Sequence, residues 1–156
     1  MALKERVVEL NKGRVIRHED RELTQAEEDA VRAEWSAGPT LDEAKAAKRD
    51  AVNAEYMACL ERGVEWNGTR WTATDAGRDT LVELHEVAQQ DGVSVTVLDA
   101  NNAAHTLSET DLGNLRAAGR TYRRQARENR LSLLQQVAAA SSVADVDAVD
   151  ETAGWP

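Results

Sequence analysis

A regular apolar repeat between Leu112 and Val137 is the feature that most constrains the fold of this chain. Its members recur every three or four residues, which is typical of one face of a single long helix. They are Leu112, Leu115, Gly119, Tyr122, Ala126, Asn129, Leu133 and Val137, with the glycine and the asparagine interrupting the apolar face. Ser108 and Asp111 form a capping sequence before the repeat. The sequence therefore predicts a helix from Ser108 to about Ala140.

Two earlier segments carry helical patterns faced with alanine. Thr24 with Glu27, and Thr40 with Glu43, are capping boxes, and "SAGPT" separates the two patterns. The alanines are Ala26, Ala30, Ala33 and Ala37 in the first pattern, and Ala44, Ala47, Ala51, Ala54 and Ala58 in the second, which runs to about Glu61. Such seams suggest close helix packing within the chain or against another chain. The alternative is that alanine is there because it favours helix.

The stretch "WNGTRWTATD" contains the strongest hairpin signal in the chain. Apolar residues flank Asn67-Gly68, a pair typical of two-residue turns, so Trp66 is expected to pair with Thr69. A helix is predicted after Thr74 and a second hairpin in "VSVTVLDANNAAHTLS". Two short β segments, "RVVEL" and "RVIRH", flank an Asn-Lys-Gly turn at the N-terminus.

Composition indicates a thin core that depends on few large side chains. The 156 residues include four tryptophans, two tyrosines and no phenylalanine, and much of the apolar content is alanine. The expected core therefore centres on Trp66, Gly68 and Trp71 packed against Leu112 and Leu115, with Trp155 closing the domain. We predict an α+β fold with an N-terminal β/helix arm (1–39) and a C-terminal domain (40–156) in which two hairpins form one small sheet packed on helices.

Charge and cysteine content limit the partners and the cellular compartment that this chain can be expected to have. The net charge of −9 argues against nucleic-acid and anionic-membrane partners. Cys59 is the single cysteine, so an intramolecular disulfide is excluded and a reducing compartment is expected, with the thiol buried. The first residues, "MALKERVVEL", are too polar for a signal peptide. These features favour a soluble, cytoplasmic-type protein.

No group of residues predicts catalysis, a metal or a cofactor. His18, His85 and His105 fall in three different segments, and "HEVAQ" lacks the second histidine of a helical zinc motif. The acidic "DVDAVDE" lacks the glycine and the glutamate of a calcium loop. There is neither a hydrolase serine elbow nor a phosphate-binding glycine loop. We therefore expect a protein that is not an enzyme.

Arginines form a stripe beside the apolar repeat. They are Arg116, Arg120, Arg123, Arg127 and Arg130. One interpretation is a basic edge that docks an acidic surface next to a hydrophobic contact. The other, which we favour from sequence, is a solvated flank neutralised by the acidic excess of the chain, because surface ion pairs contribute little. Ala44, Ala47 and Ala51 are the other candidate partner contacts.

The order of motifs over about residues 50 to 156 resembles a phage-encoded domain family of unknown function. The shared pattern is Trp-x-Gly-x-x-aromatic-x-x-x-Asp at Trp66, Gly68, Trp71 and Asp75, then a strand leading into a helix start at Leu107, Ser108 and Leu112. Serine stands where the family has threonine. The chain also closes on Gly154-Trp155-Pro156, as the family does.

The resemblance implies a role without enzymatic residues. Proteins with this domain are commonly encoded near tail-fibre genes, so it implies a tail or tail-fibre-associated protein of a phage that contacts other tail proteins, with a homo-oligomer as a further expectation. Its expected locations are the host cytoplasm during assembly and the virion tail. A transient fibre-assembly chaperone is the alternative, and a small enzyme or regulator using the hairpin cleft is a further one.

Overall fold

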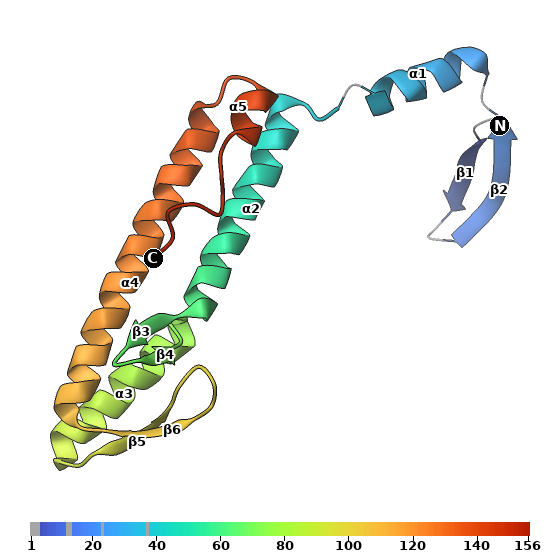
Figure 1. Ribbon diagram of the computed structural model, residues 1–156. Helices are drawn as coiled ribbons and strands as arrows, with labels where there is room; N and C mark the ends of the chain where they lie inside the picture. Colours follow the sequence, from blue (N-terminus) through green and yellow to red (C-terminus); the bar gives the residue numbers. More distant parts are fainter. Residues whose placement is uncertain (1–3, 12–13, 23, 37) are drawn as a thin grey trace. The chain divides into compact units, whose positions relative to one another are not determined.

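The computed structural model describes residues 4–11, 14–22, 24–36 and 38–156, which form two compact units, Met1–Pro39 and Thr40–Pro156. The first unit holds an antiparallel pair, β1 (Lys4–Asn11) and β2 (Arg14–Glu22), followed by helix α1 (Gln25–Ser36) (Figure 1). The backbone nitrogen of Thr24 donates to Glu27 Oε2 at 2.8 Å, as the predicted capping box requires. Residues 12 and 13 of the predicted Asn-Lys-Gly turn lie outside the described residues.

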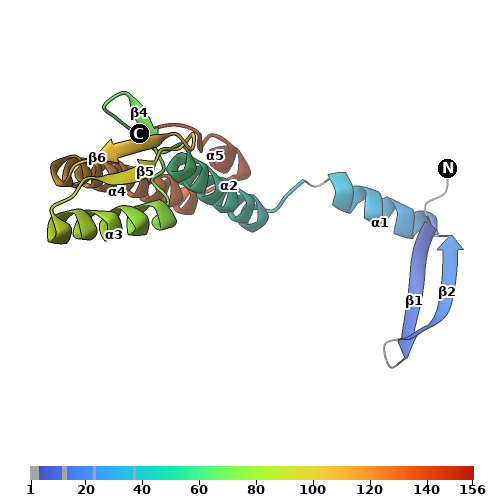
Figure 2. The same cartoon turned by 90° about the horizontal axis from the view of Figure 1, so that it is seen from below.

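The second unit combines helices with two short hairpins, and the predicted α+β class with a long C-terminal helix is confirmed. Its elements are α2 (Leu41–Arg62), β3 (Val64–Trp66), β4 (Thr69–Trp71), α3 (Asp75–Asp91), β5 (Val95–Leu98), β6 (Ala104–Leu107), α4 (Glu109–Ala139) and α5 (Val143–Asp147). Within this unit α3 and the hairpins lie beside the first half of α4, and α2 lies beside the second half (Figure 1). Figure 2 shows the same division along α4 from below.

Helix α4 is the longest helix of the second unit. Its predicted apolar face is confirmed. Ser108 caps the helix: the Ser108 hydroxyl accepts a hydrogen bond from the Asp111 nitrogen, and the Asp111 carboxylate accepts one from the Ser108 nitrogen. The buried side chains are Leu112, Leu115, Tyr122, Ala126, Leu133 and Val137. Six of the eight predicted positions therefore form the core, because helical spacing brings them onto one face.

The hairpin at Asn67-Gly68 forms in the predicted register, with Trp66 opposite Thr69. Trp71 pairs with Val64, which places the two indole rings diagonally on one face with centroids 6.4 Å apart. Only Trp71 is fully buried, at 3% exposure, whereas Trp66 is half-buried. Gly68 is exposed at φ +72, so it serves the turn and its predicted place in the core is corrected.

The two hairpins do not form one small sheet, as the sequence suggested, but two separate two-stranded sheets. Strands of three and four residues offer few ladder positions. One backbone hydrogen bond joins the hairpins, from the Ala100 nitrogen to the Arg70 carbonyl oxygen at 2.9 Å, and the rings of Trp71 and His105 lie with their centroids 5.2 Å apart. Their shared attachment is the core beneath them, where Trp71 and the second hairpin's Val97 meet Leu112.

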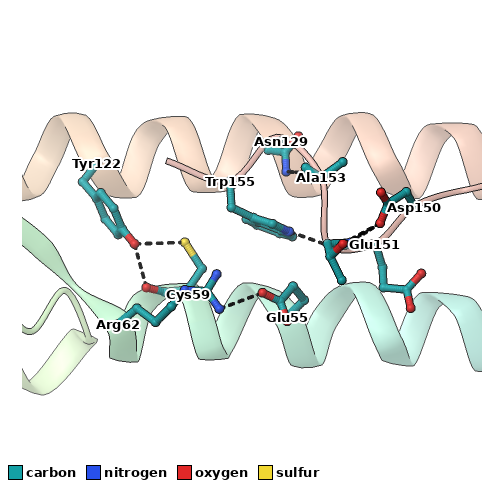
Figure 3. Close-up of polar contacts among 10 residues, drawn as sticks. Glu55, Cys59, Arg62, Tyr122, Asn129, Asp150, Glu151, Ala153 and Trp155 are labelled. Atoms are coloured by element: carbon teal, nitrogen blue, oxygen red, sulfur yellow. Dashed lines mark hydrogen bonds and ion pairs between the residues drawn. The ribbon is translucent and has the colours of Figure 1, made fainter.

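The C-terminal tail folds back between α2 and α4 (Figure 3). Asn129, which interrupts the apolar face of α4, donates from Nδ2 to the Ala153 carbonyl at 2.9 Å. Trp155 is half-buried, with its ring centroid 6.3 Å from that of Tyr56, and its indole nitrogen donates to the Glu151 carbonyl at 2.8 Å. The asparagine in the repeat thus holds the tail against the helix pair.

Cys59 is fully buried, as expected for an unpaired thiol in a helix core. The Tyr122 hydroxyl on α4 donates a hydrogen bond to the Cys59 carbonyl oxygen at 2.8 Å, and Cys59 Sγ lies 3.2 Å from the Tyr122 hydroxyl oxygen (Figure 3). Burial raises the pKa of Tyr122 because the charged phenolate would lose its solvation. The phenol therefore stays neutral and joins α2 to α4.

The alanines of α2 do not share one environment. Ala44 is buried, Ala51 is half-buried and Ala47 is exposed. The face turned to the core carries Val52 and Cys59 instead, because their larger side chains bury more apolar area than alanine does. Ala44 is therefore unavailable to a partner. In α1, Ala26 and Ala30 are exposed, and the side chains of Ala33 and Ala37 lie outside the described residues.

Acid is expected to weaken the second unit, because several of its carboxylates are hydrogen-bonded in the charged form. The Ser108 hydroxyl lowers the pKa of Asp111, His105 lowers that of Asp99, and Lys48 lowers that of Glu151. A lowered folded-state pKa contributes stability that is complete above the unfolded value, about 4. That stability is lost as pH falls through the lowered folded values.

Urea unfolding between neutral pH and about pH 2 measures this dependence. The midpoint should hold above about pH 5 and fall steadily below about pH 4. Ser108→Ala removes one of the hydrogen bonds that favour ionised Asp111, so it should flatten the acid-side slope. An unchanged slope in this variant would contradict the role of the cap.

Candidate functional site

An elongated hollow of about 400 Å³ lies between α3 and α4. Its floor is apolar and is formed by Ala73, Leu81, Val82, Gly119 and Leu131. Thr72 and Glu128 also line it, and the rest of the lining is a rim of six arginines: Arg78, Arg116, Arg120, Arg123, Arg124 and Arg127. We call this feature the arginine groove.

The groove arises because α4 is longer than α3. Thr74 caps the start of α3 by accepting from the Gly77 nitrogen at 3.2 Å, and this start lies beside Arg123. From there α4 continues to Ala139, so Arg127 and Leu131 extend the groove past the start of α3. Leu131 is 53% exposed and adds apolar surface to this part of the groove.

Four of the rim arginines have partners within the second unit. Arg123 donates to the Ala73 carbonyl at 2.6 Å and pairs with Asp75, and this guanidinium lowers the pKa of the Asp75 carboxyl. The other three pairs are Arg78 with Asp79 at 2.6 Å, Arg124 with Glu128 at 3.3 Å, and Arg116 with Nδ1 of His85. These contacts hold the rim in shape.

Arg120 and Arg127 differ from the other four. Both are exposed, and within the described part of the chain neither makes a hydrogen bond or an ion pair. They are seven residues apart, which places them on one side of α4 about 10 Å apart along its axis. Besides the Arg123 guanidinium, the charge of Arg127 contributes to the lowered pKa of Asp75, but no carboxylate of the described residues is in direct contact with Arg127. The groove thus presents beside its apolar floor two cations that are free of hydrogen bonds and ion pairs among the described residues.

The predicted arginine stripe divides in the structure. Arg116, Arg120, Arg123 and Arg127 line the groove, but Arg130 does not. Arg130 turns to α2, where Nε donates to Asn53 Oδ1 at 2.8 Å and the guanidinium lies 5.0 Å from the centroid of Tyr56. The flank of α4 that faces α3 near its start therefore faces α2 further along.

Sequence reasoning did not identify Arg78, Val82, Gly119 or Leu131 as parts of a site. The sequence does mark Leu131 as an apolar residue with no place in the core, because it lies outside the three-and-four spacing of the buried face. It also marks Gly119 as a gap in that face. Arg78 and Val82 come from a different helix, and nothing local in the sequence places them opposite α4.

The histidines do not come together. His85 lies beside Arg116, whereas His105 contacts Asp99 Oδ2 at 2.9 Å, and the side chain of His18 lies outside the described residues. Among the residues that the structure describes, no three His, Cys, Asp or Glu side chains cluster as metal ligands, and no helix is long and apolar enough to cross a membrane.

A second, polar hollow of about 290 Å³ lies at the turns of the hairpins, where the enzyme or regulator alternative would place its site. It is lined by Glu65, Gly68, Thr69, Arg70, Asp99 and Asn101. The Asp99 carboxylate already accepts hydrogen bonds from the Asn101 and Ala103 nitrogens at 2.7 and 2.9 Å, besides its contact with His105. These bonds shape a turn, so the arginine groove is the better candidate for a binding site.

Comparison of the chain with protein-family models, with curated proteins and with solved structures gave no match. The arginine groove and the order of motifs in the second unit are therefore the features that bear on function.

Gly119 can be replaced without disturbing the fold. A Cβ built at this residue meets no heavy atom within 4 Å, and the residue lies inside α4. Gly119→Ala is expected to raise the free energy of unfolding by about 0.5–1 kcal/mol, because glycine loses more backbone entropy in a helix. Urea unfolding measures the gain.

Gly77→Ala serves as the contrast. Its Cβ would lie 2.5 Å from Thr72 Oγ1 at the start of α3, so this variant should lose stability. A loss of stability in Gly119→Ala as well would mean that the groove floor is more tightly packed than the structure describes.

Proposed function

We propose that this chain is a docking protein that acts by protein–protein contact and not by catalysis. The observation that carries this proposal is the arginine groove, which combines an apolar floor with two exposed arginines that make no hydrogen bond or ion pair with the described residues. Apolar surface beside arginines that can pair with a partner is typical of protein–protein interfaces, in which arginine is enriched. The remaining pairs on the rim give the groove a defined shape before a partner arrives.

Within this class, we propose a component of a phage tail or tail fibre. Support comes from the order of Trp66, Gly68, Trp71 and Asp75, from the helix start at Ser108, and from the Gly-Trp-Pro ending. All of these lie in the second unit, which also carries the groove. The partner would be another tail or tail-fibre protein, met in the host cytoplasm during assembly.

Mass spectrometry of particles purified from the source that encodes this chain tests the proposal. Stoichiometric recovery of the chain with tail proteins would support a virion component. Recovery bound to a fibre protein in lysates, but not in particles, would support the alternative of a transient assembly chaperone. Failure to recover it with any tail protein in either fraction would overturn the phage assignment.

A further inference from the structure

The chemistry of the arginine groove narrows the kind of partner that fits it. A free inorganic anion would use the arginines but leave the floor of Leu81, Val82 and Leu131 uncovered. Covering an apolar floor stabilises a complex in proportion to the area removed from water. The ligand must therefore present apolar side chains and negative charge together.

The helical walls of the groove decide which backbone conformation the ligand adopts. Its lining residues belong to α3, to α4 and to Thr72 and Ala73 just before α3, so no strand edge borders it. An extended peptide would find no ladder for its backbone groups, whereas a helix satisfies them internally. Gly119 adds no side chain to the floor, which lets a third helix approach α4 at close-packing distance, about 8–10 Å between axes.

Acidic side chains around the rim favour a protein over a nucleic acid. Glu128 lines the groove, and Asp75 and Asp79 hold the paired arginines at its edge. The net charge of −9 on the whole chain opposes the approach of a long phosphate backbone. Two free arginines with acidic neighbours are instead expected to bind a ligand that carries a few carboxylates spaced to pair with them.

We propose that the arginine groove binds one amphipathic, acidic α-helix of a partner protein. The apolar face of that helix covers Leu81, Val82, Gly119 and Leu131, and two of its carboxylates, about two turns apart, pair with Arg120 and Arg127. This inference rests on the proposed docking function and specifies the partner of the same site. It requires no change of fold, because Arg120, Arg127 and Leu131 are already exposed and Val82 and Gly119 are half-buried, whereas Ala73 and Leu81 form the buried base of the groove.

Fluorescence anisotropy with the full chain and labelled synthetic helical peptides tests the proposal. One peptide carries leucines on one face and glutamates seven residues apart beside them, and a second has lysines in place of the glutamates. A single-stranded oligodeoxynucleotide is the third probe. We expect the glutamate peptide to bind, with weaker binding as salt is raised, and the lysine peptide to bind at least about tenfold more weakly.

Three variants assign this binding to the groove. Arg120→Glu and Arg127→Glu should each weaken binding of the glutamate peptide about tenfold, because each turns one attractive charge contact into a repulsive one. Gly119→Leu fills the floor without meeting neighbouring atoms at its Cβ, so it should abolish binding while the chain stays folded by circular dichroism. Arg49→Glu on α2 makes the same charge change on an exposed residue outside the groove and should leave binding within about twofold.

Several results would overturn the proposal. They are no binding of the glutamate peptide, equal or tighter binding of the lysine peptide, preference for the oligonucleotide, or binding that the groove variants do not change. The outcome of the particle experiment does not depend on these results. If a tail partner is captured equally well by the Gly119→Leu variant, the docking function stands but the groove is not its site. If the peptide binds the groove but no tail partner is found, the groove stands as a binding site but the docking function in a phage tail does not.

Discussion

Trp71→Ala is expected to reduce the free energy of unfolding of the second unit by about 3–5 kcal/mol. The indole is 3% exposed and joins β4 to the α3–α4 core through Leu81, Leu112 and Leu115. Few other large side chains are available in a chain without phenylalanine to fill the resulting cavity. Urea unfolding followed by circular dichroism measures the loss, because tryptophan fluorescence itself changes in the variant.

Two matched variants separate burial from the loss of an aromatic residue as such. Trp66→Ala, on the same hairpin face but half-buried, should cost clearly less than Trp71→Ala. Trp71→Phe keeps a ring in the core, and it removes an indole nitrogen that is buried without a hydrogen-bond partner among the described residues. It should therefore retain most of the stability. Equal losses at Trp66 and Trp71 would argue against this account of the core.

Gly63→Ala is expected to have an effect of similar size for a different reason. Gly63 ends α2 at φ 74 and ψ 179, a backbone region that is essentially restricted to glycine. A Cβ there would lie 2.0 Å from the Trp71 carbonyl oxygen, so β4 would have to move. Backbone strain and this clash together should cost more than about 3 kcal/mol.

Gly92→Ala provides the control for Gly63→Ala. Gly92 ends α3 at φ 66 and ψ 27, and nothing lies within 4 Å of a Cβ built on it. Its replacement should therefore cost only the left-handed conformation, about 1–2 kcal/mol. Urea unfolding of both variants compares them directly, and a cost at Gly63 no larger than that at Gly92 would show that the close approach to Trp71 is unimportant.

Local patterns predicted the elements well because their causes are local. The helix from Ser108, its capping residues and its buried face follow from side-chain spacing along one helix. The Asn67-Gly68 hairpin follows from the positive φ angles that these two residues tolerate, 50° and 72°. These features need no knowledge of what packs against them.

The alanine seam and the small sheet were predicted less well because they depend on competition between distant segments. Ala47 faces solvent because burying Val52 and Cys59 against α4 gains more apolar area. The hairpins form separate two-stranded sheets because each is anchored to the helices below it and only one backbone link joins them. Neither outcome can be predicted from the spacing of residues within one segment.

The sequence by itself determined the helices, the turns, the apolar face of α4 and the arginines beside it, since each depends on residues close together in the chain. Only the tertiary structure decided which of those arginines stay free. Arg123 and Arg130 found partners on α3 and α2, while Arg120 and Arg127 did not among the described residues. The physical reason is that the role of a charged side chain depends on what lies opposite it. Arg123 lies beside Asp75 at the start of α3, whereas Arg127 lies on the part of α4 that continues past that start.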